Sequence, residues 1–126
     1  MTMSMKAAKI PGPDHPIAIT PTEGRVIVRF AGEIVADSAR ALTLREASYP
    51  PVQYIPREDA RMAHFARTAH ATYCPYKGEA SYFSLKSESG GAENAVWSYE
   101  APFPAVREIA GHLAFYPNKV DIELKG

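Results

Sequence analysis

The segment 72–78 contains a thiol at Cys74, an ammonium group at Lys77 and a turn-forming glycine at Gly78. A cation near a cysteine lowers the pKa of the thiol and favours the reactive thiolate. Cys74 is therefore a candidate nucleophile with Lys77 as its electrostatic partner. A free cysteine is also commonly a small, buried apolar side chain, so both roles stay open.

Several carboxylates are candidates for acid–base chemistry: Asp37, Glu46, Glu58 and Asp59. Glu58 stands where a helix is expected to begin, and negative charge is favoured there by the helix dipole. A structural role therefore leads for Glu58. Asp59 and Glu46 stay open, and Asp59 joins Cys74 and Lys77 as a catalytic candidate.

A metal site would need His64, His70 and Cys74 to converge, because these are the nearest ligand types along the chain. The sequence has neither a Cys-x-x-Cys pair nor two histidines at helical i, i+4 spacing, the usual marks of zinc sites. Gly90 and Gly91 lack the following Lys-Ser/Thr of a phosphate-binding P-loop. We expect no metal and no cofactor.

Aromatic residues with polar tips recur through the chain, and such residues line pockets and interfaces or fill β cores. The set comprises Tyr54, Tyr73, Tyr76, Tyr82, Trp97 and Tyr99. Strand order suggests that some of them lie near Arg57, Asp59 and Lys77.

The elements that would position these residues read mainly as short strands. Residues 25–30 alternate arginine with valine and phenylalanine, the period of a half-buried strand. Ala31-Gly32 predicts a hairpin turn to a partner strand over 33–37. Further strands are expected at 41–46, 52–55, 80–85 and 94–99, with a loop over 87–93.

Two short helices are expected between the strands. Met62, Phe65 and Ala66 recur at helical spacing after the acidic residues Glu58 and Asp59, which predicts an amphipathic helix over about 58–67. A helical turn is expected at 104–110. Residues 114–116 and 120–124 are interpreted as a closing hairpin.

The chain is expected to fold as one β-rich domain over 17–126, preceded by an extended arm over 1–16. The class is mainly β, with compact antiparallel sheets, rolled or sandwich-like, and two short helices. Three prolines within 11–16 exclude regular structure from the end of the arm.

Charge and cysteine content limit the function classes. Lysine plus arginine and aspartate plus glutamate are balanced at 14 each, so neither nucleic acid nor an anionic membrane is an expected partner. One cysteine excludes an intramolecular disulfide, and no apolar run suits a signal peptide or a membrane span. These features predict a cytoplasmic protein.

The order of several motifs resembles the family called domain of unknown function 427. Its early part resembles the stretches 35–38 and 54–59. Its later part resembles the Cys-Pro-Tyr-Lys-Gly run at 74–78, the Trp-Ser-Tyr run at 97–99 and the stretch 114–116. The resemblance covers about residues 17–124.

This resemblance implies a compact all-β fold of the Mss4-like type. Zinc-binding proteins of that fold use two Cys-x-x-Cys knuckles, which the single Cys74 cannot supply. The family is also filed under a nucleotidyltransferase heading, but such enzymes show a Gly-Ser motif followed by paired carboxylates. This sequence lacks that Gly-Ser helix start.

Three functions follow as hypotheses. The leading one is a small-molecule binding domain whose pocket is lined by Tyr54, Arg57, Asp59, Cys74, Lys77, Trp97 and Tyr99. The second is an enzyme of transferase or hydrolase type in which Cys74 or Asp59 acts on a ligand. The third is a homo-oligomer or protein-interaction module, since tyrosine and tryptophan are enriched at interfaces.

Overall fold

A computed structural model describes residues 8–126 and consists mainly of strands, so the predicted mainly β class is confirmed. The strands are β1 (Ile17–Pro21), β2 (Arg25–Phe30), β3 (Glu33–Ser38), β4 (Leu42–Glu46), β5 (Val52–Tyr54), β6 (Phe65–Cys74), β7 (Gly78–Ser87), β8 (Gly90–Ser98), β9 (Ala114–Phe115) and β10 (Asp121–Lys125). The helical segments are short 3₁₀ turns: η1 (Arg57–Asp59), η2 (Met62–His64) and η3 (Pro104–Ile109).

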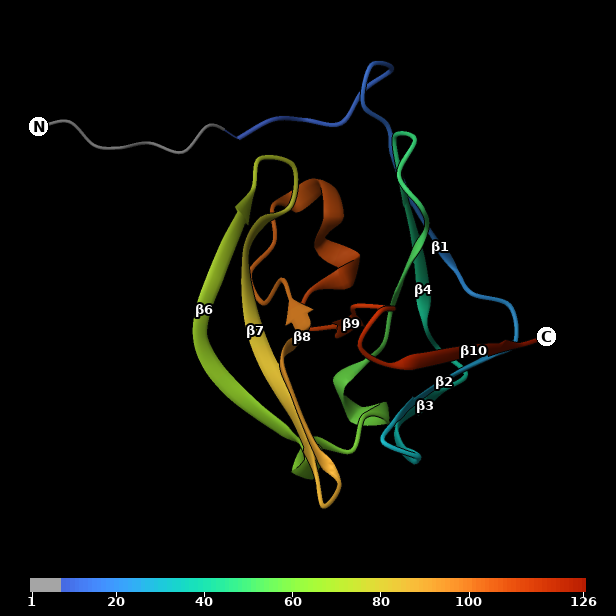
Figure 1. Ribbon diagram of the computed structural model, residues 1–126. Coiled ribbons are helices and arrows are strands. Elements are labelled where there is room, and N and C mark those ends of the chain that lie inside the picture. Colours follow the sequence, from blue (N-terminus) through green and yellow to red (C-terminus); the bar gives the residue numbers. More distant parts are fainter. Residues whose placement is uncertain (1–7) are drawn as a thin grey trace, which may run out of the picture.

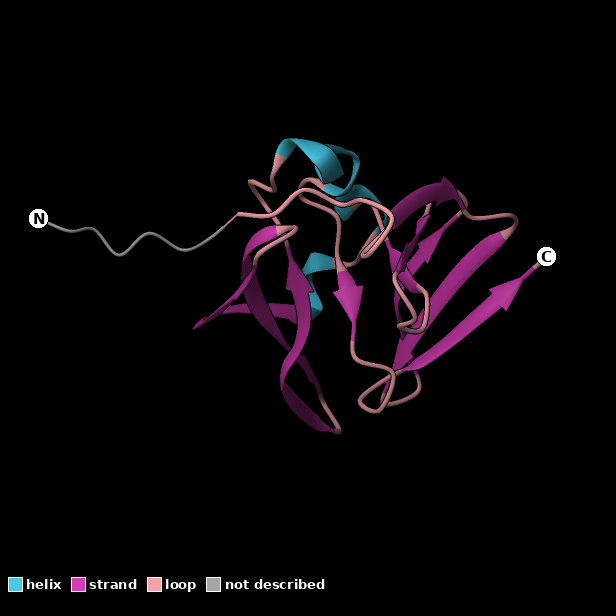
Figure 2. Cartoon of the chain, turned by 90° about the horizontal axis from the view of Figure 1, so that it is seen from above, coloured by secondary structure: helices cyan, strands magenta, loops and turns pink. Residues whose placement is uncertain are grey.

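The strands form three antiparallel sheets in the orders β1-β4-β5, β10-β2-β3 and β6-β7-β8-β9. The four-stranded sheet lies on one side of the molecule, and the two three-stranded sheets lie on the other (Figure 1). Seen from above, the two sides face each other (Figure 2). In Figure 1, η3 lies near the upper end of the four-stranded sheet. Non-consecutive neighbours, such as β10 beside β2, connect distant parts of the chain.

The predicted hairpin at Ala31-Gly32 is confirmed. Ala31 and Gly32 have φ angles of 53° and 81°, and the flanking strands β2 and β3 pair antiparallel. Two positive φ values in a two-residue loop match the twist of adjacent strands. Gly32 adopts this conformation without strain, whereas a residue with a Cβ, such as Ala31, adopts it less readily.

The predicted helix over 58–67 is wrong. Only the turns η1 and η2 are helical there, and Phe65 already begins β6, where it pairs with Leu85. The apolar residues of this segment have helical spacing, but pairing with β7 in the sheet determines its conformation instead of local propensity. The predicted turn at 104–110 is confirmed by η3.

The predicted closing hairpin is also wrong. Ala114 and Phe115 form β9 and pair with β8, whereas β10 pairs with β2 in a different sheet. The sequence pattern located both strands but could not identify their partners, because each pairs with residues far away in the chain.

Of the predicted arm, residues 1–7 lie outside the described part, and residues 8–16 form no regular element beyond one bridge between Gly12 and His15.

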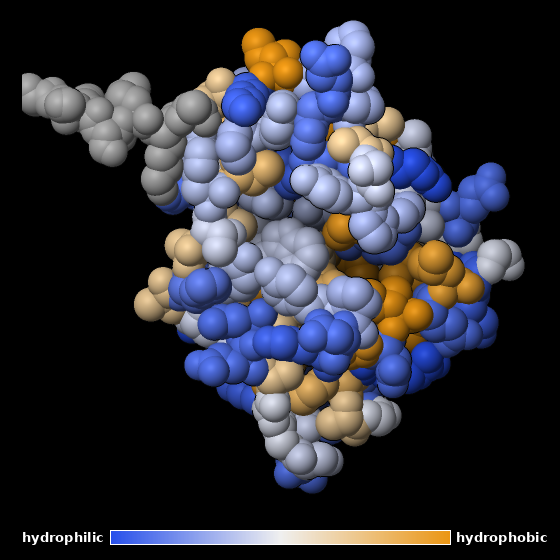
Figure 3. Space-filling view, turned by 45° about the horizontal axis from the view of Figure 1, so that its top comes forward, coloured by the Kyte–Doolittle hydropathy of each residue, from blue (hydrophilic) through white to orange (hydrophobic). Residues whose placement is uncertain are grey.

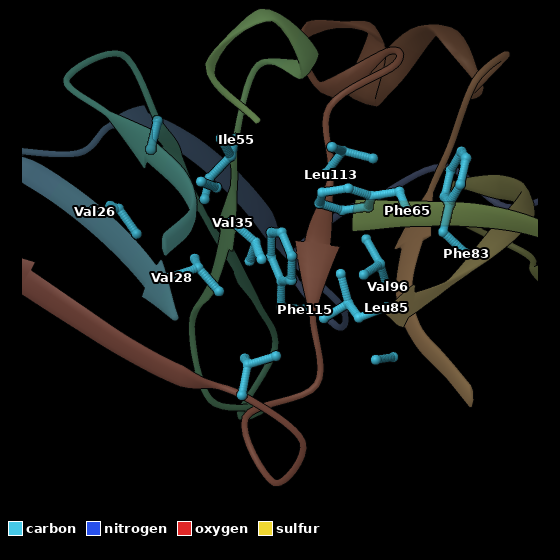
Figure 4. Close-up of a cluster of buried hydrophobic side chains, with 14 residues drawn as sticks. Val26, Val28, Val35, Ile55, Phe65, Phe83, Leu85, Val96, Leu113 and Phe115 are labelled. Carbon is cyan, nitrogen blue, oxygen red and sulfur yellow. The ribbon is translucent and has the colours of Figure 1, made fainter. Parts of the chain in front are cut away.

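The buried side chains fall into two clusters. The first, which we call the aliphatic cluster, consists of aliphatic side chains and three phenylalanines. It lies between the β2-β3 pair and one face of the four-stranded sheet, and Leu113 and Phe115 lie between the two sides (Figure 4). Its larger members are Val26, Val28, Val35, Ile55, Phe65, Phe83, Leu85, Val96, Leu113, Phe115 and Val120.

The tyrosine cluster lies against the other face of the four-stranded sheet and includes residues of β4, β5 and η3. Its buried members are Leu44, Tyr54, Ala80, Tyr82, Tyr99, Val106, Ile109 and Ala114, with Cys74, Trp97 and Tyr116 among the partly buried residues packed against them. Successive residues such as Tyr82 and Phe83 belong to different clusters because side chains alternate across a strand.

Candidate functional site

A pocket of about 240 Å³ opens within the tyrosine cluster. It is lined by Leu44, Glu46, Tyr49, Pro50, Val52, Tyr54, Lys77, Tyr82, Trp97, Tyr99 and Tyr116. We call it the aromatic pocket. Strands β4, β5, β7 and β8 each supply lining side chains, so rigid elements and not a single loop determine its shape.

A buried ion pair forms one part of the pocket wall. The ammonium Nζ of Lys77 donates a hydrogen bond to Oε1 of Glu46, and the two residues are only 7% and 9% exposed. Lys77 follows the end of β6 in a tight turn, where its backbone N–H donates to the carbonyl of Cys74. The turn at 75–77 therefore directs the ammonium group of Lys77 inward toward β4.

The N-terminal arm contributes a second partner for Glu46. His15 Nε2 lies 2.7 Å from the second carboxylate oxygen of Glu46, and the His15 ring stacks on Tyr76 with centroids 3.9 Å apart. The backbone N–H of Lys9 also donates to the carbonyl of Pro75 at 2.8 Å. Residues 9–15 therefore pack on the turn that carries Lys77.

The protonation of Glu46 is determined by two opposing effects. Burial alone would raise the pKa of its carboxyl, but hydrogen bonds from Lys77 and His15 outweigh that effect and lower the pKa. Glu46 is therefore ionised at neutral pH, and its charge is balanced by Lys77. The pocket contains fixed opposite charges and no net charge from this pair.

The aromatic walls are joined by hydrogen bonds. Trp97 Nε1 donates to the hydroxyl of Tyr54 at 3.2 Å, and the Tyr82 hydroxyl lies 3.2 Å from that of Tyr116. The Trp97 and Tyr116 rings are in tilted contact, with centroids 4.6 Å apart. Such partners satisfy the polar tips of aromatic side chains and hold the rings in place.

Burial also keeps the phenols neutral. It raises the pKa of Tyr54 and of Tyr99, and it raises the pKa of Tyr116 to about 12 with a further contribution from the hydrogen bond with Tyr82. Lys77 Nζ lies 5.8 Å from the centre of the Tyr99 ring, within range of a cation–π contact. The pocket thus offers neutral hydroxyls, ring faces and one ammonium group.

The structure brings four of the predicted ligand-binding residues together in this pocket: Tyr54, Lys77, Trp97 and Tyr99. Cys74 lies next to them, partly buried against the tyrosine cluster, but it is not part of the pocket lining. The strand β6 ends at Cys74 and β7 begins at Gly78, so residues 75–77 form the turn between the two strands.

Arg57 and Asp59 lie elsewhere. Arg57 donates to Glu100 and to Ser98, and it borders an open hollow of about 600 Å³ that also includes Glu58 and His112. Asp59 accepts hydrogen bonds from Ser38 at 2.7 Å and from Arg40 at 3.2 Å, which lower the pKa of its carboxyl. Neither residue belongs to the aromatic pocket.

Glu100 lies between two guanidinium groups outside the pocket. Arg67 binds both of its carboxylate oxygens, at 3.1 and 2.7 Å, and Arg57 binds one of them at 3.0 Å. Both guanidinium groups also lie over the ring of Phe83. The hydrogen bonds from Arg67 are the main reason that the pKa of Glu100 falls to about 2.

Sequence reasoning missed several lining residues, including Tyr49, Val52 and Tyr116. It named Glu46 only as an open candidate, although a signal was present. Leu42, Leu44 and Glu46 share one face of a predicted strand, so Glu46 occupies an apolar position, where an acid needs a buried partner. His15 gave no such signal, because the proline-rich arm has no periodicity.

Other candidates gave no site in the described residues. Within 8–126, no group of three or more histidine, cysteine, aspartate or glutamate side chains lies close enough together to hold a metal ion. His64 bonds the carbonyl of Lys86 and His70 packs against Tyr82. In the same part of the chain, no helix is long and apolar enough to cross a membrane.

Comparison with protein families gives a match over most of the chain. Residues 18–126 match the family model described as a domain of unknown function (DUF427). A comparison with curated proteins returned no match. The matched range includes every residue that lines the aromatic pocket, and it begins after the arm that carries His15.

Proposed function

This chain belongs to the DUF427 family, and we propose that it binds a small single-ring aromatic compound that carries a carbonyl oxygen. The ring would lie among Tyr54, Trp97 and Tyr99, and the oxygen would accept a hydrogen bond from Lys77. The observation that carries this proposal is the convergence of ring faces and one buried ammonium group in a single pocket.

Size supports a ligand with one ring. The aromatic pocket measures about 240 Å³, below the roughly 300–1,000 Å³ of pockets that enclose drug-sized ligands. Aromatic side chains contact flat rings by stacking or edge-to-face packing, which adds affinity beyond area burial. A view of the molecule with its top turned forward shows a recess between pale side chains of intermediate hydropathy (Figure 3).

Charge supports an uncharged ligand. Lys77 and Glu46 already balance each other, so a neutral ligand leaves no unpaired charge in a largely buried site. An ammonium group has three N–H donors, and the bond to Glu46 uses one of them. A carbonyl oxygen can therefore accept from Lys77 without breaking the ion pair.

Fluorescence provides the test, because Trp97 is the single tryptophan of the chain and lies in the pocket wall. We expect benzamide to change Trp97 emission saturably. Two control compounds should bind at least about tenfold more weakly than benzamide. Cyclohexanecarboxamide keeps the carbonyl but lacks the aromatic ring, and benzylamine replaces the carbonyl with a cation.

A pocket-filling variant separates specific binding from quenching in solution. Val52→Phe places a larger side chain in the pocket wall and should weaken benzamide binding by about tenfold. Ala63→Phe makes a comparable change on an exposed surface elsewhere and should leave binding unchanged. Equal responses from both variants, or equal binding of all three compounds, would contradict the proposal.

An enzyme remains a second candidate because the Cys74 thiol adjoins the same pocket. In that case Cys74 would act on the bound compound and Lys77 would stabilise negative charge. Asp59 is less suited to this role, since it lies outside the pocket and is bonded to Ser38 and Arg40. Modification of native Cys74 by iodoacetamide faster than that of a free thiol at neutral pH would support the enzyme.

A further inference from the structure

The strand β10 is the edge of its sheet, and its outer side has no strand beside it in the described residues. It pairs with β2 alone, through a register that places Ile122 opposite Val28 and Leu124 opposite Val26. An exposed edge presents unpaired backbone N–H and C=O groups, which can pair with another strand.

Two apolar side chains are exposed on this edge. Leu124 is 58% exposed and Ile122 is 36% exposed. Directly opposite residues in an antiparallel pair lie on the same face of a sheet, so Ile122 and Leu124 continue the apolar face formed by Val26 and Val28. Apolar side chains gather on the side of the molecule where β10 runs (Figure 3). The buried face of the sheet therefore ends at an exposed apolar edge.

The opposite edge of the same sheet is treated differently. Residues 60 and 61 cover the free edge of β3: Ala60 forms a bridge with Ala36, and the backbone N–H of Arg61 donates to the carbonyl of Val35 at 2.8 Å. The Arg61 guanidinium also bonds the carbonyl of Ile34. The chain thus covers one edge of this sheet and leaves the other uncovered within residues 8–126.

We propose that β10 pairs antiparallel with β10 of a second copy of this chain, across a two-fold axis at Glu123. The pairing would join the two β10-β2-β3 sheets into one continuous sheet of six strands. A two-fold interface requires a surface that is complementary to itself. The side chains of β10 meet that requirement.

The order of residues along β10 supplies the complementarity. With the axis at Glu123, Asp121 of one copy stands opposite Lys125 of the other, and Ile122 stands opposite Leu124. Opposite charges and apolar pairs directly across from each other are the stabilising pairs of antiparallel strands. An unrelated partner would have to reproduce this pattern, whereas a second copy has it already.

The two Glu123 side chains would meet at the axis, where like charges are unfavourable. Each is already bonded to Arg29 of its own chain, at 2.8 Å, and this bond lowers the pKa of its carboxyl. The axis therefore carries two acids and two arginines in balance. Because five residues on each side form a short ladder, we expect a dimer that dissociates on dilution.

Sedimentation of the full chain tests the proposal. The mass should rise with protein concentration from the 13.8 kDa of one chain toward twice that value. Leu124→Lys should weaken the dimer by about tenfold or more, since each substitution occurs twice across the axis. Ile10→Lys, at a residue that is 87% exposed outside this strand, is the matched control and should leave the dimer unchanged.

A charge exchange identifies the register. Asp121→Lys alone should place lysines opposite each other and favour the monomer, and Lys125→Asp alone should do the same with acids. The double variant restores opposite charges and should recover the dimer, which a folding defect would not allow. A wild-type chain that is monomeric at every concentration overturns the proposal, as does a dimer that none of these substitutions weakens.

Discussion

The aliphatic and tyrosine clusters are built by the same strands but contain different chemistry. Neighbouring residues of one strand belong to different clusters: Tyr82 and Phe83 in β7, and Val96 and Trp97 in β8. The aliphatic cluster contains no tyrosine or tryptophan, whereas the tyrosine cluster contains phenols and an indole and borders a buried ion pair. The two faces of one sheet thus differ in the polar groups that they offer.

Ion pairs make the same contrast. Beside the aliphatic cluster, the charged groups are partly exposed: Arg57 and Arg67 lie over the ring of Phe83, and the side chain of Glu100, which both bind, is 33% exposed. Beside the tyrosine cluster, Lys77 and Glu46 lie inside the wall. A buried pair costs desolvation that a surface pair avoids, so a protein that needs only stability gains little from it. The position of Lys77 is therefore consistent with the binding role that we propose for the aromatic pocket.

The largest expected effect compares the same truncation in the two clusters. Leu113 and Leu44 are both almost fully buried, but Leu44 lines the pocket. Leu113→Ala should lower the free energy of unfolding by about 4 kcal/mol, because it opens a cavity in a closely packed region. Leu44→Ala should cost about 2–3 kcal/mol, since the space it vacates joins an existing pocket. Urea denaturation of both variants measures the difference, and equal losses would show that the two clusters are packed alike.

The second effect breaks the inner ion pair. Lys77→Met leaves the Glu46 carboxylate buried with His15 as its remaining side-chain partner, and it should cost about 3 kcal/mol. The double variant Lys77→Met with Glu46→Gln removes both charges and should recover most of that loss. Chemical denaturation of the two single variants and the double variant gives the coupling between the residues. Additive losses would mean that Lys77 and Glu46 do not interact appreciably.

The sequence predicted the strands whose apolar residues alternate strictly, such as β2 and β3, because that period follows from side-chain burial alone. It failed where pairing over long distances decided the outcome. Phe65 belongs to a strand because β7 pairs with it, and β10 pairs with β2 and not with β9, the strand before it in the chain. Such choices depend on the whole chain and leave little trace in a local window.

The candidate site was predictable to a similar degree. Tyr54, Lys77, Trp97 and Tyr99 were named from residue types that suit pockets, and they line one. Arg57 and Asp59 were grouped with them through strand order, but the turn η1 places them in surface ion pairs. His15 could not be found, because its contact with Glu46 spans 31 residues and begins in an arm without regular structure.

The smallest effect tests the outer ion pair through its pH dependence. The pKa of Glu100 is lowered from 4.5 to about 2, mainly by Arg67, so its contribution to stability is fully present above about pH 4.5. That contribution is lost as the pH falls from 4.5 toward 2, because the unfolded state takes up a proton on this carboxyl over that range, whereas the folded state, with the carboxylate bonded to both arginines, does not.

Glu100→Gln should therefore raise the midpoint of acid unfolding by about half a pH unit. At pH 7 it should lower the free energy of unfolding by no more than about 1 kcal/mol, the usual contribution of an exposed ion pair. Glu88→Gln, at an exposed loop residue, is the matched control and should leave the midpoint unchanged. Acid titration followed by circular dichroism measures both. If Glu100→Gln instead destabilised the protein at pH 7 as much as Lys77→Met does, the outer pair would be as important to the fold as the inner one, and the contrast between the two clusters would rest on their side chains alone.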